Sequence, residues 1–134
     1  MGHGSLYSLL IKILMAYKSQ FEVKIDRELR LQGVDFEYET VELAYMSVYK
    51  PDFILPNGII IEAKGYFKKL DRAKMIKVKR NNPRCDIRFV FQRADNVVTG
   101  SKTRMTYGQW ATKHGFPWAS GTIPKAWIDE KGTN

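Results

Sequence analysis

Cysteine and histidine are scarce in this chain, and their scarcity excludes several kinds of site. Cys85 is the single cysteine among 134 residues, so the chain can form neither an internal disulfide nor a zinc site built from several cysteines. The two histidines, His3 and His114, are far apart in sequence and lack the helical spacing of an HExxH metalloprotease site. A reducing, intracellular setting is the simpler interpretation of a chain with one thiol.

Long hydrophobic runs are also missing. The most apolar stretch, LYSLLIKILMAY, has twelve residues and contains Lys12, so it is too short to span a bilayer, and we expect no membrane partner. It has neither the preceding basic segment nor the following cleavage site of a signal peptide. We expect residues 1–17 to form an N-terminal extension or helix, and residues 18–134 to form one domain. Met15 is an alternative natural start, with the residues before it as a tag or upstream extension.

Acidic residues are the minority charge. Twenty-two Lys and Arg residues against 14 Asp and Glu residues give a formal net charge of +8. Such a balance favours binding to polyanions such as nucleic acid or an anionic membrane surface, with solubility alone as the alternative. The clustering of the basic residues favours nucleic acid. Neither a glycine-rich phosphate loop nor a base-stacking aromatic motif accompanies the charge.

The hydrophobic periodicity predicts an α/β domain with a mixed sheet. Helices are expected over 18–32, 67–81 and 107–113, strand-like runs over 35–49, 52–55, 58–63 and 86–92, and a short turn near 124–128. Gly33 follows the first helix and Pro83 follows the second. We expect the second helix to pack on the sheet through Leu70, Ala73, Ile76 and Val78.

The run KPDFILPNGIIIEAKG, residues 50–65, places charged residues in a mostly apolar hairpin. Pro56-Asn57-Gly58 is a strong turn signal, and folding back at this turn brings Asp52 towards Glu62. Because side chains alternate along a strand, Glu62 and Lys64 share one face. Two close carboxylates suit Mg²⁺ or Mn²⁺, and a neighbouring lysine can orient or deprotonate a water or stabilise charge on a phosphate. A surface salt bridge between Lys64 and a carboxylate is the alternative.

Glu22 has two possible roles. The segment SQFE, Ser19 to Glu22, fits a capping box in which Glu22 closes the helix N-terminus, and spacing alone favours that role. Glu22 could instead supply a third carboxylate to the acidic pair.

The predicted helix after the acidic hairpin is strongly basic. Seven basic residues and one acidic residue lie between Lys68 and Arg80. A solvated face is the usual explanation of such a run, but its place after the acidic strand would allow it to contact a DNA backbone. The expected DNA contacts are Lys18, Lys68, Lys69, Arg72, Lys74, Arg93, Lys102 and Arg104.

Pro-Asp, nine intervening residues and Glu-x-Lys resemble the signature of PD-(D/E)xK nucleases. Together with GVDFEYE, DIRFVF, TYGQWATKHG and IPKAWI, the run resembles the endonuclease I family of T-odd podophages over about Ser19 to Ile128. The resemblance implies a restriction-endonuclease-like mixed central sheet flanked by helices, in an intertwined or domain-swapped homodimer. It also implies a Mg²⁺- or Mn²⁺-dependent endonuclease that resolves four-way (Holliday) junctions and branched DNA in the cytoplasm of an infected bacterium.

The resemblance also implies roles for particular residues. By position, Asp52 and Glu62 resemble the metal ligands with the Ala63 carbonyl, Lys64 resembles the catalytic lysine, and Glu22 resembles a ligand of a second metal. In the family this glutamate comes from the other subunit. The segment TVELAYMSVYK, residues 40–50, is several residues shorter than the family's bridge between its halves. Two alternatives to this function are a non-catalytic DNA-binding protein and a repair or restriction nuclease acting on simple duplex DNA.

Overall fold

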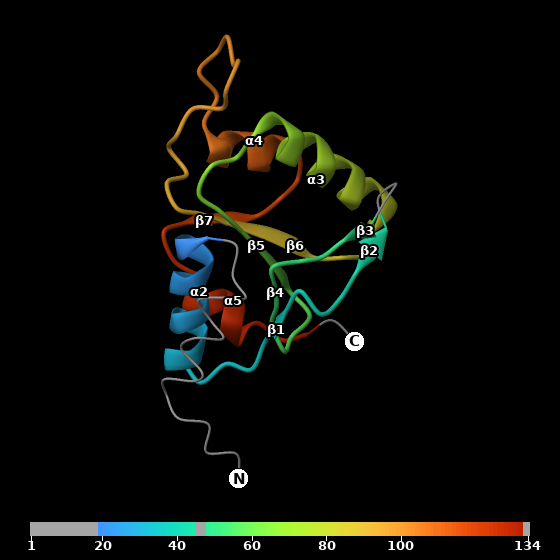
Figure 1. Cartoon of the computed structure of the whole chain (residues 1–134), viewed down its shortest axis with the longest axis vertical. Helices are drawn as coiled ribbons and strands as arrows, with labels where there is room; N and C mark the ends of the chain where they lie inside the picture. Colours follow the sequence, from blue (N-terminus) through green and yellow to red (C-terminus); the bar gives the residue numbers. More distant parts are fainter. Residues whose placement is uncertain (1–18, 45–47, 133–134) are drawn as a thin grey trace.

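A mixed five-stranded sheet organises the computed structural model, which describes residues 19–44 and 48–132 (Figure 1). The strand order is β1 (Glu37–Tyr38), β4 (Phe53–Ile54), β5 (Ile60–Lys64), β6 (Ile87–Phe91) and β7 (Trp118–Ser120). The first three strands pair antiparallel, and β5, β6 and β7 run parallel. The sheet therefore confirms the predicted α/β class and the mixed strand directions.

Helices lie on both faces of this sheet (Figure 1). One face carries α3 (Lys69–Asn81) and α4 (Tyr107–Lys113), and the other carries α2 (Gln20–Leu31) and α5 (Lys125–Asp129). A separate antiparallel pair, β2 (Leu43–Ala44) and β3 (Val48–Tyr49), lies beside α3. Because helices cover both faces, all five residues of β6 are buried, as in other parallel strands enclosed on two sides.

The β4–β5 hairpin forms as its turn residues predict. Gly58 has φ +91°, a conformation that glycine adopts without a steric penalty, and its N–H donates to the carbonyl of Leu55 at 2.9 Å. Phe53 pairs with Ile61 in the resulting register. Strand alternation then sends Ile61 into the core on the α2 face and Ile60 into the core on the α3 face.

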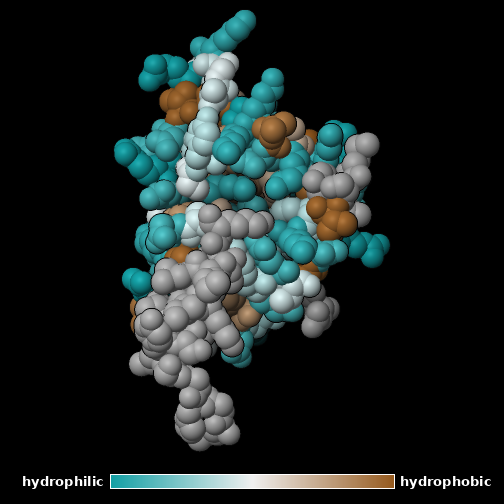
Figure 2. All heavy atoms as spheres, in the orientation of Figure 1, coloured by the Kyte–Doolittle hydropathy of each residue, from teal (hydrophilic) through white to brown (hydrophobic). Residues whose placement is uncertain are grey.

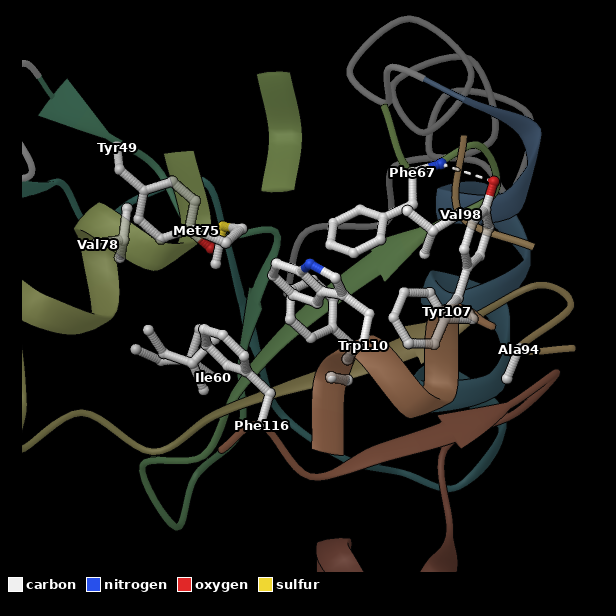
Figure 3. Close-up of a cluster of buried hydrophobic side chains, with 14 residues drawn as sticks. Tyr49, Ile60, Phe67, Met75, Val78, Ala94, Val98, Tyr107, Trp110 and Phe116 are labelled. Carbon is white, nitrogen blue, oxygen red and sulfur yellow. Dashed lines mark hydrogen bonds between the residues drawn. The ribbon is translucent and has the colours of Figure 1, made fainter. Parts of the chain in front are cut away.

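An aromatic cluster on the α3 and α4 face fixes the segment that leaves β5 (Figure 3). Phe67 is fully buried, and its ring centroid lies 4.8–5.7 Å from those of four other aromatic residues: Phe89, Phe91, Tyr107 and Trp110. The backbone N–H of Phe67 donates to the hydroxyl of Tyr107 at 3.3 Å. The chain between β5 and α3 is therefore anchored directly after Lys64.

The helix α3 packs through part of the expected stripe, since Val78 and Ile76 contact the core as predicted. Leu70 is 82 % exposed and Ala73 is also exposed, whereas Met75 and Val78 are fully buried together with most of Arg72. The prediction was wrong for Leu70 and Ala73 because the buried side of α3 is formed by Arg72, Met75 and Val78, and backbone carbonyls satisfy the guanidinium of Arg72. Ile76 is partly buried against the same cluster.

Other expectations differ from the structure in detail. The run 35–49 is divided between β1, β2 and β3, and Glu39 interrupts it with φ +52°. The short strand β7 was not predicted, and the expected turn near 124–128 is the helix α5. The expected N-terminal helix over residues 1–17 and the residue Lys18 lie outside the described residues.

The aromatic cluster makes a stability prediction. Phe67→Ala should lower the free energy of unfolding by about 3–5 kcal/mol, because it removes a fully buried ring and leaves a cavity. Urea unfolding followed by circular dichroism measures the change. Leu70→Ala, at an exposed position of the same segment, should change it by less than about 0.5 kcal/mol. Equal effects of the two substitutions would contradict this description of the core.

Candidate active site

A polar pocket of about 380 Å³ opens where β5 ends. Residues from the start of α2, the approach to β4, the end of β5 and the middle of α3 line it. Its charged side chains are three acids and three lysines: Glu22, Asp52, Glu62, Lys50, Lys64 and Lys74. The position agrees with the general tendency of open α/β sheets to bind ligands beyond the carboxyl ends of their parallel strands.

The side chain of Glu22 reaches this pocket from the first turn of α2. Ser19 caps the helix, since its hydroxyl accepts from the Glu22 N–H at 3.1 Å. The Glu22 side chain is buried, and its Oε2 accepts a hydrogen bond from the Tyr38 hydroxyl at 3.0 Å. From the sequence, Glu22 could either close the helix N-terminus or contribute to the acidic site. The serine supplies the cap, and the carboxylate lies in the pocket.

Asp52 lies directly before β4 and is also buried. Its Oδ2 accepts from the backbone N–H of Ala63, on the neighbouring strand, at 2.9 Å. Burial raises the pKa of Asp52 well above its ordinary value, and the negative charges of Glu62 and Glu22 raise it further. Lys64 and the Ala63 N–H act in the opposite direction but do not cancel this rise. Asp52 is therefore close to both glutamates that the sequence singled out.

Glu39 joins the acidic residues, although sequence reasoning did not single it out. One ligand oxygen each from Glu22, Glu39 and Asp52 lies within 4.8 Å of the other two. A regular strand would direct Glu39 to the face opposite Tyr38, but the positive φ of Glu39 breaks the alternation. The charges of both Glu22 and Glu39 accordingly raise the pKa of Tyr38, after burial of its ring. Glu39 is the last residue of the run GVDFEYE, but its sequence does not reveal the positive φ.

Glu62 lies beside that group of three, held from two directions. Its Oε2 accepts a hydrogen bond from the buried Tyr49 hydroxyl, and its Oε1 lies 3.4 Å from the Lys64 ammonium. The same ammonium lies 3.8 Å from Asp71 Oδ1 at the start of α3. Glu62 and Lys64 thus project together from β5, as strand alternation predicts.

The electrostatic surroundings of Lys64 favour its charged form. Burial by itself lowers the pKa of Lys64, but Glu62, Asp52 and Asp71 outweigh burial and raise the pKa above its ordinary value. In this arrangement Lys64 is a protonated hydrogen-bond donor at neutral pH, suited to orienting a water or an anionic oxygen.

The residues expected to contact DNA differ in exposure. Lys68, Lys69, Arg93, Lys102 and Arg104 are exposed, and Lys74 is partly buried at the pocket. Arg72 differs from the expectation: it is buried and donates to the backbone carbonyls of Phe67 at 2.7 Å and Thr99 at 3.3 Å. Its guanidinium joins two chain segments, so it is not an exposed phosphate contact.

Comparisons with known proteins identify the family of this chain. The family model described as "Phage endonuclease I" matches residues 3–134. The chain belongs to the phage endonuclease I family. The family resemblance inferred from the sequence motifs is therefore confirmed, and the match extends beyond the stretch from Ser19 to Ile128 on which it was based.

Two curated members of the phage endonuclease I family are similar over most of their length. "Endonuclease I" of Escherichia phage T7 is 37% identical over 126 residues, which cover 90% of this chain and 83% of the relative. "Endodeoxyribonuclease 1" of Enterobacteria phage T3 is 38% identical over 121 residues, which cover 86% of this chain and 78% of the relative.

Each helix in the described part of the chain is too short or too polar to cross a membrane. Among the coloured residues in Figure 2, hydrophilic ones cover most of the face shown, with separate hydrophobic patches between them.

The raised pKa of Asp52 predicts a pH-dependent stability. Between its unfolded value near pH 3.8 and its higher folded value, the folded protein holds a proton that the unfolded chain releases, so stability falls as pH rises. Asparagine carries no charge, so Asp52→Asn removes the fall in stability with rising pH. The substitution should raise the free energy of unfolding at pH 7 by about 1 kcal/mol or more. Urea unfolding in EDTA should show the gain shrinking towards pH 4.

The control is Asp95→Asn, at a side chain that is 77% exposed. This substitution should leave the pH dependence of unfolding as it is in the wild-type protein. A destabilised Asp52→Asn variant at pH 7, or a gain that grows towards acid, would contradict the electrostatic description of the pocket.

Proposed function

We propose that this chain is a metal-dependent endonuclease that hydrolyses phosphodiester bonds of branched DNA, four-way (Holliday) junctions above all. The main support is that Glu22, Asp52, Glu62 and Lys64 converge on one pocket from separate segments of the chain. Membership of the phage endonuclease I family, and relatives named as an endonuclease and an endodeoxyribonuclease, agree with this function. We also assign the hairpin and its Pro-Asp…Glu-x-Lys motif to the PD-(D/E)xK nuclease superfamily.

The chemistry of the donor set fits Mg²⁺ or Mn²⁺. Carboxylate oxygens are the ligands these hard cations prefer, and the close grouping of Glu22, Glu39 and Asp52 offers three of them. We propose that Asp52 and Glu62, with the Ala63 carbonyl, hold one ion and that Glu22 contributes to a second. When bound, such ions would polarise the phosphate and lower the pKa of a water.

The chain's own residues would supply orientation and charge. Lys64, kept protonated by its acidic neighbours, would donate to the attacked phosphate or to the attacking water. Asp52 is held by the Ala63 N–H and Glu62 by the Tyr49 hydroxyl, so both carboxylates have fixed directions before substrate arrives. Glu22, Asp52, Glu62 and Lys64 are the catalytic residues of this proposal.

The exposed basic residues near the pocket would position the DNA backbone. Lys68 and Lys69 lie at the start of α3, and Lys74 lies one turn further along the helix at the pocket. Arg93, Lys102 and Arg104 belong to the connection between β6 and α4 and would extend the contact, with Lys18 as a further predicted contact. Phosphate contacts of this kind carry little base specificity, which suits recognition by shape.

Junction selectivity would come from a homodimer that presents two pockets to two backbones. An exchange of α2 between two copies would rebuild between chains the same Glu22 and Asp52 neighbourhood that one chain forms here, because domain swapping preserves contacts. We propose this intertwined arrangement, with the segment between β1 and β4 as the connection. The phage relatives further suggest action in the cytoplasm of an infected bacterium.

The function predicts paired nicks in a synthetic four-way junction incubated with the protein and Mg²⁺. Glu62→Gln should slow cutting about a hundredfold or more, because a carboxylate ligand worth several kcal/mol of charge stabilisation is lost. Gel electrophoresis of labelled strands measures the rate. Asp129→Asn on α5, at an exposed ion pair with Lys125, should cut at the wild-type rate.

Three results would contradict this function. Binding without cutting at any Mg²⁺ concentration would indicate a DNA-binding protein. Equal cutting of a linear duplex of the same length would indicate a nuclease without junction selectivity. Undiminished cutting by Glu62→Gln would remove the proposed site.

The exchanged dimer predicts complementation between two inactive variants. When Glu22→Gln and Glu62→Gln proteins are unfolded and refolded together, each mixed dimer regains one intact site and leaves the other with both substitutions. About a quarter of all sites should then be active if chains pair at random. The nicking rate of the refolded mixture is the measurement. No recovery, with mixed dimers verified by mass, would show instead that each chain completes its own site.

A further inference from the structure

Two tyrosine hydroxyls contact the acidic residues of the pocket, one for each glutamate. Tyr38, at the end of β1, donates to Glu22 Oε2 at 3.0 Å. Tyr49, at the end of β3, donates a hydrogen bond to Glu62 Oε2. Both tyrosines belong to the connection between α2 and β4, so this connection is bonded at each end to a different glutamate.

Tyr49 is held rigidly enough to fix the direction of its hydroxyl. Tyr49 is 3% exposed and belongs to the same buried cluster as Met75 and Val78 of α3 (Figure 3). The Lys74 ammonium lies 5.6 Å from the centroid of its ring. A ring enclosed in this way cannot swing to follow a moving carboxylate, so the carboxylate of Glu62 must adopt the direction that the hydroxyl sets.

Tyr38 holds Glu22 from a less enclosed position. Its ring is partly buried and lies against Phe53 of β4, with the centroids 5.4 Å apart. A tyrosine hydroxyl is protonated at neutral pH, so Tyr38 and Tyr49 each act as the donor in the hydrogen bond to their glutamate.

In Glu62 and Asp52, specific carboxylate oxygens are held by neighbouring donors. Glu62 uses Oε2 for Tyr49 and turns Oε1 towards Lys64, 3.4 Å away. Asp52 uses Oδ2 for the Ala63 N–H. A glutamate side chain otherwise has several rotatable bonds, and fixing it before a ligand arrives reduces the entropy that binding must overcome.

We propose that Tyr49 and Tyr38 are positioning residues that orient Glu62 and Glu22 to hold a divalent cation. This inference rests on the proposed function, since it assigns a role to two residues around the same metal site. Hydrogen-bond partners of metal ligands typically change metal affinity by about 10–100-fold when they are removed. Neither tyrosine would touch the metal or the DNA.

The test measures Mn²⁺ binding to the protein without DNA, by the electron paramagnetic resonance signal of free Mn²⁺. Tyr49→Phe keeps the ring and removes only the donor, and it should weaken Mn²⁺ binding about tenfold. Tyr38→Phe should also weaken Mn²⁺ binding. This variant tests the proposal if the buried Tyr49→Phe variant fails to fold. Nicking rates should approach the wild-type value at high Mn²⁺ concentration, since the ligands themselves remain.

Tyr107→Phe is the matched control. It removes a buried hydroxyl from the same cluster, but this hydroxyl accepts from the Phe67 N–H, and Tyr107 is not among the described residues that line the pocket. Its Mn²⁺ affinity should stay within about twofold of the wild-type protein, although it loses a hydrogen bond.

The outcomes separate this inference from the proposed function. Wild-type Mn²⁺ affinity in both Tyr49→Phe and Tyr38→Phe, with the wild-type protein binding Mn²⁺ normally, would overturn the positioning role alone. Equal weakening in Tyr107→Phe would also overturn it, because the effect would then come from general loosening of the core. Failure of the wild-type protein to bind Mn²⁺ would overturn the metal site and this role together.

Discussion

Mutual repulsion between buried carboxylates is the constraint on which the site depends. Two unit negative charges 4 Å apart repel each other by about 4 kcal/mol in surroundings of intermediate polarity. The protein offsets part of this cost with neutral or positive donors: the Ala63 N–H at Asp52, the Tyr49 hydroxyl at Glu62, and the Lys64 ammonium 3.4 Å from Glu62. Asp52 nevertheless keeps a raised pKa, so the compensation is incomplete. A divalent cation would complete it, which is why the same arrangement that strains the folded chain suits metal-assisted hydrolysis.

The scaffold brings these charges together by ordinary packing. The turn at Gly58 sets the register that places the Ala63 N–H beside Asp52, and the Ser19 cap starts α2 with Glu22 in its first turn. Burial of Phe67 among the aromatic residues anchors the chain just after Lys64. Asp71 at the start of α3 then lies within 3.8 Å of the Lys64 ammonium. Core packing and site geometry are therefore linked through one short segment, residues 60–71.

The sequence was sufficient where local rules decide the structure. Turn chemistry predicted the hairpin, strand alternation predicted that Glu62 and Lys64 project together, and the periodic runs predicted the helices α2, α3 and α4 to within about two residues. Glu39 escaped prediction because its place in the acidic group depends on a positive φ, which no residue type other than glycine signals strongly. The contacts of Tyr49 and Tyr38 required tertiary structure, since each tyrosine meets a glutamate 13 or 16 residues away. Arg72 was assigned to the surface because arginine usually lies there, whereas the backbone carbonyls of Phe67 and Thr99 satisfy its guanidinium inside.

Diffraction from a crystal soaked in Mn²⁺ tests the central claim most directly, because the anomalous signal locates the ion and the map shows its ligands. The account predicts a peak in the pocket, about 2.0–2.6 Å from a carboxylate oxygen of Asp52 and from one of Glu62 or Glu22. A pocket without a peak at saturating Mn²⁺, or carboxylates of Asp52 and Glu62 directed away from each other, would contradict it.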